Sequence, residues 1–416
     1  MKHVRILTLA SLGTTLTALL IAQGCSSSST TETGGSSSSS PTNQGSHSSS
    51  NGGTSSSSKS STSSSSSVGG SSSGGGSSSS SAATGTGLPP QPMGAATTST
   101  TAHNFAIHHL YVGDDDPNPM YTADPNAWKT IGYNVDGLDS TASSTNVCTP
   151  YTKGTTVQQV DGANGIDNAF ASQIAPQLGL IGNLSQTVSL DIIKGSFTIE
   201  IDTTGLDGTA TQTATALGGQ LFAGATYTGG AAPPLTGNYF SATDNWPVSE
   251  ALLTDGMTIA GGSKIKFPAA YVTKGVWVSG APVNLGLSLS LEGESLTLTI
   301  HHAVMSFQYA ANGTTGLATN GVISGVLETT EFIAAINQVV GSIQGGADCA
   351  IVSTILPLIE NSQDIIIDPT TGDVSNTAGT ACNGISIGLA FDADEIMPPS
   401  IVAAPVDAGT PSPPCN

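Results

Sequence analysis

Apolar and polar residues alternate along much of the chain between residues 98 and 395. Residues 285–291 place leucine at every second position, and residues 296–300 continue the alternation after Gly293. Because successive side chains of a strand point to opposite faces, each run predicts a strand with one apolar and one polar face, and the two together predict a β-hairpin. Similar patterns predict further strands at 104–112, 197–202, 271–279, 304–309, 322–327 and 385–391.

Helical spacing of apolar residues is confined to three segments. Residues 331–343 carry apolar residues three and four apart and are followed by two glycines, which predicts a helix that ends there. A second helix is predicted over 350–359, where Pro357 would kink it or end it early. A third is predicted over 168–178, with Asp167 as its N-cap.

Strands with one apolar and one polar face are typical of antiparallel sheets that pack in two layers. We therefore expect a mainly β fold, an antiparallel two-layer β-sandwich of jelly-roll type with two or three short helices. Every Phe, Tyr and Trp lies between Phe105 and Phe391. One domain over residues 98–395 is thus expected to contain all the large core-forming side chains.

The first residues have the pattern of an export signal. Lys2 and Arg5 precede an apolar run over residues 6–21, which is too short and too rich in threonine for a comfortable bilayer span. Small residues then precede Cys25. The pattern predicts a signal peptide over residues 1–24.

The stretch Ile21-Ala22-Gln23-Gly24-Cys25 resembles the lipobox of bacterial lipoproteins, in which a small residue precedes the cysteine that is lipidated. The resemblance implies that cleavage leaves Cys25 as the lipidated N-terminus, and Ser26 resembles a sorting signal for the outer membrane. It covers these residues alone, and Ala22 stands where the family usually has leucine. From the residues alone, the alternative is a secreted protein that is cut near Ala22.

A low-complexity stalk is predicted to follow the anchor, over residues 25–97. Residues 26–87 are almost wholly Ser, Gly and Thr, with Glu32 and Lys59 as the charged residues. Such a segment buries too little apolar surface to offset chain entropy, so we expect disorder and an average span of roughly 40 Å. A shorter Pro- and Ala-rich tail over 396–416 is also expected to lack regular structure.

The charge of the chain is strongly unbalanced. Its 416 residues include 9 Lys and Arg against 29 Asp and Glu, which gives a formal net charge of −20, and Arg5 is the one arginine. An acidic surface repels a phosphate backbone, so no nucleic-acid partner is expected. The chain also lacks the arginine side chains that usually clamp phosphate or carboxylate substrates.

The cysteines predict disulfides. If Cys25 carries lipid, Cys148, Cys349, Cys382 and Cys415 remain, an even number in an oxidising compartment. Four cysteines allow three pairings. We expect Cys349 to pair with Cys382, the nearer partner in sequence, and Cys148 to pair with Cys415 and so fasten the tail to the domain.

A loop rich in Asp, Asn and Gly over residues 160–168 is a candidate calcium site. Asp161, Asn164 and Asp167 place oxygen atoms three residues apart, with glycines that permit tight turns. Calcium takes six to eight oxygen ligands on such bent loops. The loop resembles calcium-binding loops in general, but it differs from the EF-hand pattern because Ala163 occupies a ligand position. The alternative is a set of turns in which Asp167 caps a helix.

Residues that could carry catalysis are few, and we predict none. The doublets His108-His109 and His301-His302 lie on predicted strands, where each would place one histidine on either face, so a zinc pair would need two facing strands. Glu200-Ile201-Asp202 looks like the start of the ExDxE signature of laminarinase-type β-sandwich glycosidases, but Thr204 stands in place of the second Glu. Alternation alone would put Glu200 and Asp202 on the solvent face.

Trp246 lies between Asn245 and Pro247 and is the best candidate for an exposed aromatic ring that binds a sugar. The alternative is that so few aromatic residues are all needed in the core. Our leading interpretation is a non-enzymatic, lipid-anchored outer-membrane or cell-surface protein that displays a binding or structural β-domain, with a glycan or a surface protein as its ligand. The alternatives are a calcium-dependent carbohydrate-binding module and a secreted glycoside hydrolase.

Overall fold

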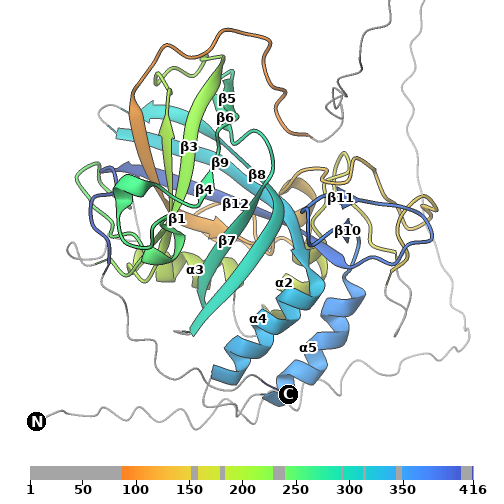
Figure 1. The fold of residues 1–416 in the computed structure, drawn as a ribbon. Helices are drawn as coiled ribbons and strands as arrows, with labels where there is room; N and C mark the ends of the chain where they lie inside the picture. Colours follow the sequence, from red (N-terminus) through yellow and green to blue (C-terminus); the bar gives the residue numbers. More distant parts are fainter. Residues whose placement is uncertain are drawn as a thin grey trace, which may run out of the picture. The chain divides into compact units, whose positions relative to one another are not determined.

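The computed structural model describes residues 87–150, 158–178, 183–227, 239–291, 294–312, 315–342, 349–403 and 415. Strands dominate these residues, and all strand pairs are antiparallel. The expected mainly β, antiparallel fold with short helices is confirmed (Figure 1). Cys25 and residues 26–86 of the expected stalk lie outside the described residues. No helix of the described residues is long and apolar enough to span a membrane.

The large sheet contains ten strands. They are β1 (Ala102–Tyr111), β2 (Thr198–Thr204), β3 (Ala214–Gly224), β4 (Ile265–Lys266), β5 (Ala270–Thr273), β6 (Val276–Val278), β7 (Val283–Leu291), β8 (Glu294–Asn312), β9 (Thr315–Glu328) and β12 (Gly384–Ile396). A second, two-stranded sheet joins β10 (Ile366–Ile367) to β11 (Val374–Ser375).

The large sheet closes on itself. Its strand order is β2-β1-β12-β9-β8-β6-β5-β3-β4, and β2 also pairs with β3. Hydrogen bonding therefore continues around a ring and is not divided between two sheets. The hairpin predicted from the leucine alternation is present as β7 and β8. The strand predicted over 271–279 is two strands, β5 and β6, because Lys274 and Gly275 turn the chain with positive φ angles of 51° and 78°.

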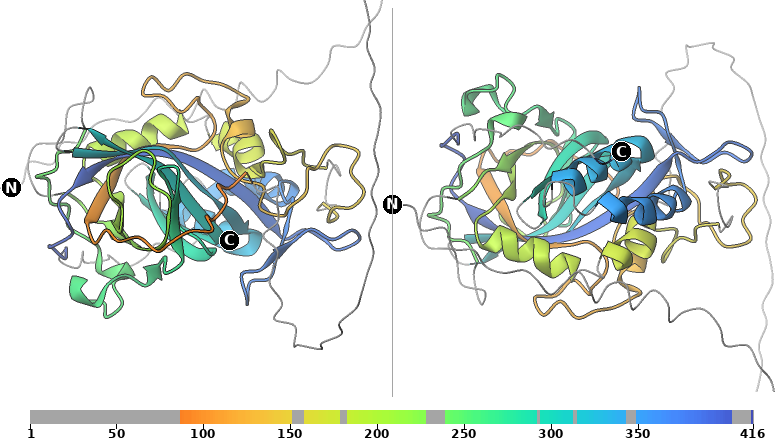
Figure 2. Two further views of the ribbon diagram at one scale, coloured as in Figure 1. Left: turned by 90° about the horizontal axis from the view of Figure 1, so that it is seen from above. Right: turned by 90° about the horizontal axis from the view of Figure 1, so that it is seen from below.

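Aromatic side chains fill the inside of the ring. Phe307 is the centre of this packing, with its ring 5.0 Å from that of Trp277, 5.2 Å from that of Phe105 and 6.4 Å from that of Phe391. All four side chains are at most 1% exposed. Figure 2 shows the strands curving around the space that these side chains occupy. Burial of such large apolar surfaces is the main contribution to the stability of the domain.

Helices cover one end of the ring and one strand edge (Figures 1 and 2). They are the π-helix η2 (Phe170–Ile174), α2 (Ala175–Leu178), α3 (Leu184–Ile193), α4 (Thr329–Ser342) and α5 (Cys349–Asn361), with short 3-10 turns η1 (Ala127–Thr130), η4 (Glu250–Leu252) and η5 (Ile259–Gly261). The helices predicted over 331–343 and 350–359 correspond to α4 and α5, and α5 continues past Pro357.

Helix α3 was not predicted from the sequence pattern. It pairs with the backbone donors of β1 beyond the point where β2 ends. The Ser189 hydroxyl accepts the Leu110 N–H at 3.0 Å, and the Ser185 hydroxyl accepts the Val112 N–H at 2.9 Å. Both serines are fully buried. These hydroxyls satisfy backbone donors that would otherwise be unpaired at a buried strand edge, which is costly.

The expectation that Asp167 caps a helix is wrong. The Ala171 N–H at the start of the 168–178 helical segment donates to the side chain of Asn168, at 3.1 Å, and not to Asp167. The Asp167 carboxyl instead accepts the N–H groups of Val135 and Asp136, at 2.6 and 3.2 Å. The Asn168 amide also donates to the carbonyls of Ile131 and Gly388, so this residue links the start of the helical segment to two other parts of the chain.

The disulfide in the described residues joins Cys148 to Cys382, with Cα atoms 5.3 Å apart. The expected pairings of Cys349 with Cys382 and of Cys148 with Cys415 are therefore wrong. The two segments lie side by side, because Thr149 and Ala381 form a parallel bridge. Cys415 is also disulfide-bonded, and its N–H donates to the Asn337 carbonyl at 3.2 Å. The Cys349 side chain lies outside the described residues.

Candidate functional site

The predicted calcium loop brings two of its three expected ligands together. The carboxyl groups of Asp161 and Asp167 are joined by a hydrogen bond. Asn164, in contrast, is exposed at the tip of the loop with a positive φ of 58°. The site therefore has a different composition from the one expected, because the backbone turn at Asn164 directs that residue toward solvent.

Two further carboxylates lie beside this pair. Burial raises the pKa of Asp167 most, and the negative charges of Asp136 and Asp364 raise it further. The Asp136 carboxyl accepts the Asn376 amide at 2.6 Å, and the Asp364 carboxyl accepts the N–H of Ser386 at 2.8 Å. Because these residues come from distant segments, no local motif could have predicted that they meet.

Neutral donors, not cations, serve these four carboxyl groups, Asp136, Asp161, Asp167 and Asp364. Among the described residues, the one lysine paired with a carboxylate is Lys194, which lies 3.8 Å from Asp191. Burial, and to a smaller extent the charges of neighbouring carboxylates, raises the pKa of Asp161 to about 6 and that of Asp364 to about 7, while the hydrogen bonds from Ser140 and Ser386 oppose this rise. The cluster thus holds protons near neutral pH.

The same cluster is not a finished metal site. The described part of the chain contains no group of three or more His, Cys, Asp or Glu side chains arranged to hold a metal ion. The hydrogen bond between the carboxyl groups of Asp161 and Asp167 requires a proton on one of them. Calcium binding would require these two carboxyl groups to lose their shared proton and turn toward a common centre.

A second buried polar cluster surrounds the first histidine doublet. The expectation that His108 and His109 point to opposite faces is wrong, because the register of β1 against β12 shifts between Ile107 and His109. Such a bulge inserts one residue and interrupts the alternation of side chains. The two imidazole rings consequently lie on the same side, with centroids 4.6 Å apart.

The two histidines contact residues from three segments. His108 Nδ1 lies 3.0 Å from a carboxylate oxygen of Asp394 on β12. The Tyr239 ring stacks on His108 with centroids 4.6 Å apart and contacts the His109 ring at the same distance. Tyr121, from the loop after β1, lies edge-on to His109 at 5.7 Å. The cluster thus joins β1, β12 and the segment that begins at Tyr239.

Burial dominates the electrostatics of this second cluster. It lowers the pKa of His109 to about 3, with a further contribution from His108, so His109 is neutral. Burial also raises the pKa of Tyr121 to about 12 and that of Tyr111 well above its usual value. Among the described residues, His109 Nδ1 and the Tyr111 hydroxyl have no hydrogen-bond partner. Unpaired buried polar atoms are costly, so this cluster is not ordinary core.

The other predicted site residues are buried. Glu200 and Asp202 share a face, as expected, but it is not a solvent face, because Glu200 is 0% exposed. The Asn104 amide donates to Glu200 at 2.9 Å, and burial raises the pKa of Glu200 to about 8. Asp202 accepts the Gln220 amide at 2.7 Å.

Trp246 does not provide the expected exposed ring. It is 0% exposed, and its indole N–H donates to the Ala225 carbonyl at 2.5 Å. The rings of Tyr227 and Phe240 contact it at 4.9 and 5.1 Å. The alternative reading of a core tryptophan applies, because this chain has few large aromatic side chains with which to fill its core.

The second histidine doublet supplies no zinc pair. His301 Nε2 lies 2.8 Å from the Glu331 carboxylate on α4, whereas His302 Nδ1 contacts the Gly372 carbonyl at 3.1 Å. The two side chains thus bind different elements. Each links β8 to a neighbouring segment, which is a structural role.

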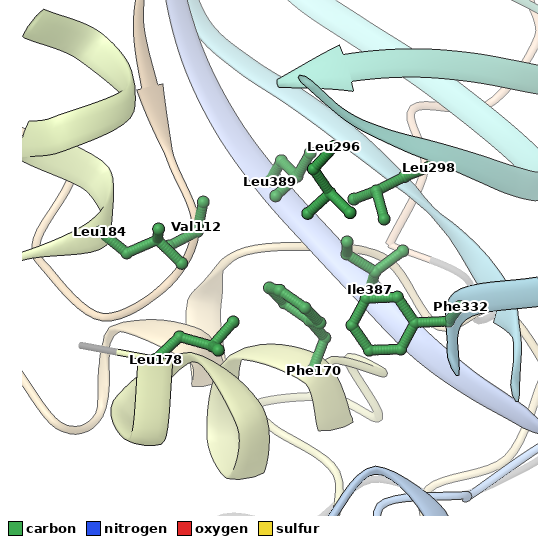
Figure 3. A pocket seen from close by; sticks show the side chains of 9 residues that line it. All are labelled: Val112, Phe170, Leu178, Leu184, Leu296, Leu298, Phe332, Ile387 and Leu389. Atoms are coloured by element: carbon green, nitrogen blue, oxygen red, sulfur yellow. The ribbon is translucent and has the colours of Figure 1, made fainter. Parts of the chain in front are cut away.

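A small apolar cavity lies where the helices meet the end of the ring. Its volume is about 20 Å³, enough for a water-sized probe, and it is lined by Val112, Phe170, Leu178, Leu184, Leu296, Leu298, Phe332, Ile387 and Leu389 (Figure 3). No polar side chain lines it. Cavities of this kind stay dry and reflect imperfect packing between layers.

Comparisons with protein families, curated proteins and solved structures find no match for this chain.

Proposed function

We propose that the chain is a non-enzymatic, lipid-anchored protein of the outer membrane or cell surface, which displays its β-domain on the Ser/Gly-rich stalk. The resemblance of Ile21–Cys25 to a lipobox and the composition of residues 26–86 motivate the anchor and the stalk. The function of the domain on this reading is structural or binding.

The attachment of the chain just before β1 is the observation that carries this proposal. Thr97 donates its N–H to the Thr215 carbonyl at 2.9 Å, and Thr215 donates its own N–H to the Ala95 carbonyl at 3.1 Å. The Thr97 hydroxyl donates to the Gly205 carbonyl at 2.7 Å. A pulling force on the stalk would therefore act on these bonds before it acted on β1. Figure 1 shows this segment, in orange, running beside β3 and β5.

The packing inside the ring also supports display of the outer surface. Closed antiparallel sheets of about this size either fill their interior with side chains or hold one small ligand. Here Phe105, Trp277, Phe307 and Phe391 fill it and are at most 1% exposed. Contacts with a glycan or a surface protein would therefore involve the outside of the domain.

Membrane fractionation tests the anchor. Cys25→Ser should move the full-length chain from the membrane fraction to the soluble fraction, because lipid on that residue would be the anchor. Ser27→Cys in the Cys25→Ser background is a matched control, since it restores a thiol two residues away from the lipobox and should not restore membrane association. Unchanged fractionation of Cys25→Ser contradicts the proposal. Protease accessibility of the wild-type chain on intact cells then distinguishes cell-surface from periplasmic display.

A second candidate function is calcium-dependent binding. The observation that favours it is the gathering of Asp136, Asp161, Asp167 and Asp364 without a lysine partner among the described residues. A divalent cation would relieve the repulsion among these carboxylates. Because Trp246 is buried, a calcium-dependent sugar site would have to use other aromatic residues.

A further inference from the structure

The segment from Tyr239 to Val248, here called the strap, runs from the second polar cluster on β1 and β12 to the end of β3, where Val248 bridges to Gly224. Its two ends are held differently. At one end, Pro247 and Val248 are fixed by backbone bonds, in which Ala225 N–H donates to the Pro247 carbonyl at 2.7 Å and Val248 N–H donates to the Ile401 carbonyl at 2.8 Å. These bonds carry no titratable group, so they are insensitive to pH.

The other end of the strap is held by the second polar cluster. Phe240 donates its N–H to the Asp394 carboxylate at 2.9 Å, and the same carboxylate lies 3.0 Å from His108. The Tyr239 ring covers both His108 and His109. Tyr239 and Phe240 are themselves 8% and 4% exposed. This end of the strap therefore covers both histidine rings.

We propose that acid releases the Tyr239–Phe240 end of the strap and uncovers His108 and His109 on β1. The bulge in β1 is the geometric basis, because it places two imidazole rings side by side beneath one tyrosine. A proton on His109 has no acceptor among the described residues, since its Nδ1 atom is unpartnered. Protonation thus favours the open arrangement, in which water solvates the imidazolium.

Several titratable groups lie in the cluster or on the segments beside it. They are Tyr111 on β1, Asp392 and Asp394 on β12, Glu200 on β2, Tyr239 on the strap, and Asp115 and Tyr121 in the loop after β1. His109 has a pKa lowered by burial, so opening takes up its proton below about pH 6.5. Asp392 acts in the opposite sense, because burial raises its pKa and opening would release its proton.

Hydrogen exchange of the full-length chain between pH 7 and pH 4 tests the proposal, with the Phe240 amide as the reporter and the β6 segment as the internal reference. After correction for intrinsic exchange, we expect protection of Phe240 to fall with acidification while β6 stays protected. His109→Asn removes one proton from the opening reaction. Its pH dependence should therefore be shallower than that of the wild type by about tenfold per pH unit between pH 6 and pH 4.

His302→Gln is the matched control. His302 also has a pKa lowered by burial, but it contacts Gly372 and not the strap, so the Phe240 profile should stay that of the wild type. Equal slopes for the wild type and His109→Asn would overturn the proposal, as would loss of protection in Phe240 and β6 together. If His109→Asn does not fold, the wild-type comparison decides: loss of protection in Phe240 alone on acidification supports the proposal, and loss in Phe240 and β6 together overturns it.

Discussion

The carboxyl groups of Asp161 and Asp167 are hydrogen-bonded to each other, so a proton lies between two acidic residues of one loop. Two negative charges in contact would repel strongly in a buried site, and keeping one of them neutral removes that repulsion. Asp136 and Asp364 add negative charge beside the pair. The loop is thus stabilised either by protons or by a cation that replaces them.

Calcium should stabilise the domain if this exchange occurs. At a hundredfold excess over its dissociation constant, an ion that binds only the native state adds about 2.7 kcal/mol to the free energy of unfolding. The effect should grow between pH 5 and pH 8, because calcium competes with the proton on Asp161. Thermal unfolding in EDTA and in excess calcium measures it.

Asp161→Asn should abolish the calcium effect, whereas Asp207→Asn should not, because Asp207 lies in an exposed turn and accepts the Thr209 N–H at 2.9 Å. Identical wild-type unfolding curves in EDTA and in calcium at pH 8 would end the calcium hypothesis. The loop would then be a proton-linked turn.

The free energy of unfolding should fall as the pH rises from 6.5 to 8.5. Burial raises the folded pKa of Glu200 to about 8. The contribution of this group to the free energy of unfolding is therefore complete below its unfolded pKa and is lost as the pH rises to its folded pKa of about 8. The loss between pH 6.5 and pH 8 is about 2 kcal/mol for Glu200. Asp364, with a pKa of about 7, adds a smaller loss in the same direction.

Chemical denaturation at half-unit pH steps checks this prediction. His109 acts with the opposite sign, but its contribution changes only below about pH 6.5 and so does not affect this window. Glu200→Gln should flatten the profile, because the amide cannot ionise and can still accept the Asn104 amide hydrogen. Stability that is constant or rises over the window would refute the assignment.

Peptide mapping without reduction should recover Cys148 linked to Cys382. The bond closes a loop with a sequence separation of 234 residues, so the chain-entropy model gives at most about 5 kcal/mol of stabilisation. Reduction should lower the melting temperature accordingly. A peptide that links Cys148 to Cys415 would contradict the structure, and free thiol at Cys415 would contradict its disulfide.

Asn168→Ala should destabilise the domain by about 3 kcal/mol or more. Its side chain donates to the carbonyls of Ile131 and Gly388, at 2.9 and 3.1 Å, and accepts the N–H groups of Ala171 and Gly388, at 3.1 and 3.0 Å. Removal leaves buried backbone groups unpaired, each at a cost of roughly 1–3 kcal/mol.

Ser249→Ala is the comparison for Asn168→Ala. Ser249 caps the short η4 turn and is not deeply buried, so its loss should cost no more than about 1 kcal/mol. Urea denaturation gives both values. Similar losses for the two variants would mean that Asn168 is an ordinary cap and does not link the helical segment to β12 and to the loop that contains Ile131.

Strand and helix positions were largely predictable because their signals are local. The leucine alternation over 285–291 reports the pleat of β7 itself, and the helical spacing over 331–343 reports the turns of α4. Lipidation at Cys25 is likewise a prediction from neighbouring residues, and it stays one. The charge imbalance and the aromatic content follow from composition alone.

Long-range pairing decided the rest. Closure of the ring depends on β2 meeting β3, and the disulfide depends on Cys148 meeting Cys382. The gathering of Asp136 and Asp364 around the 160–168 loop has the same cause.

The bulge at His108 shows why the sequence pattern and the tertiary structure place these side chains differently. Alternation assigns side chains to faces only while the register with the neighbouring strand is unbroken, and that register is set by β12, which is far away in sequence. The sequence by itself therefore determined which segments form strands and helices, because neighbouring residues carry that information. Tertiary structure alone decided which polar side chains meet and lose their water, because burial is a property of the contacts between distant segments.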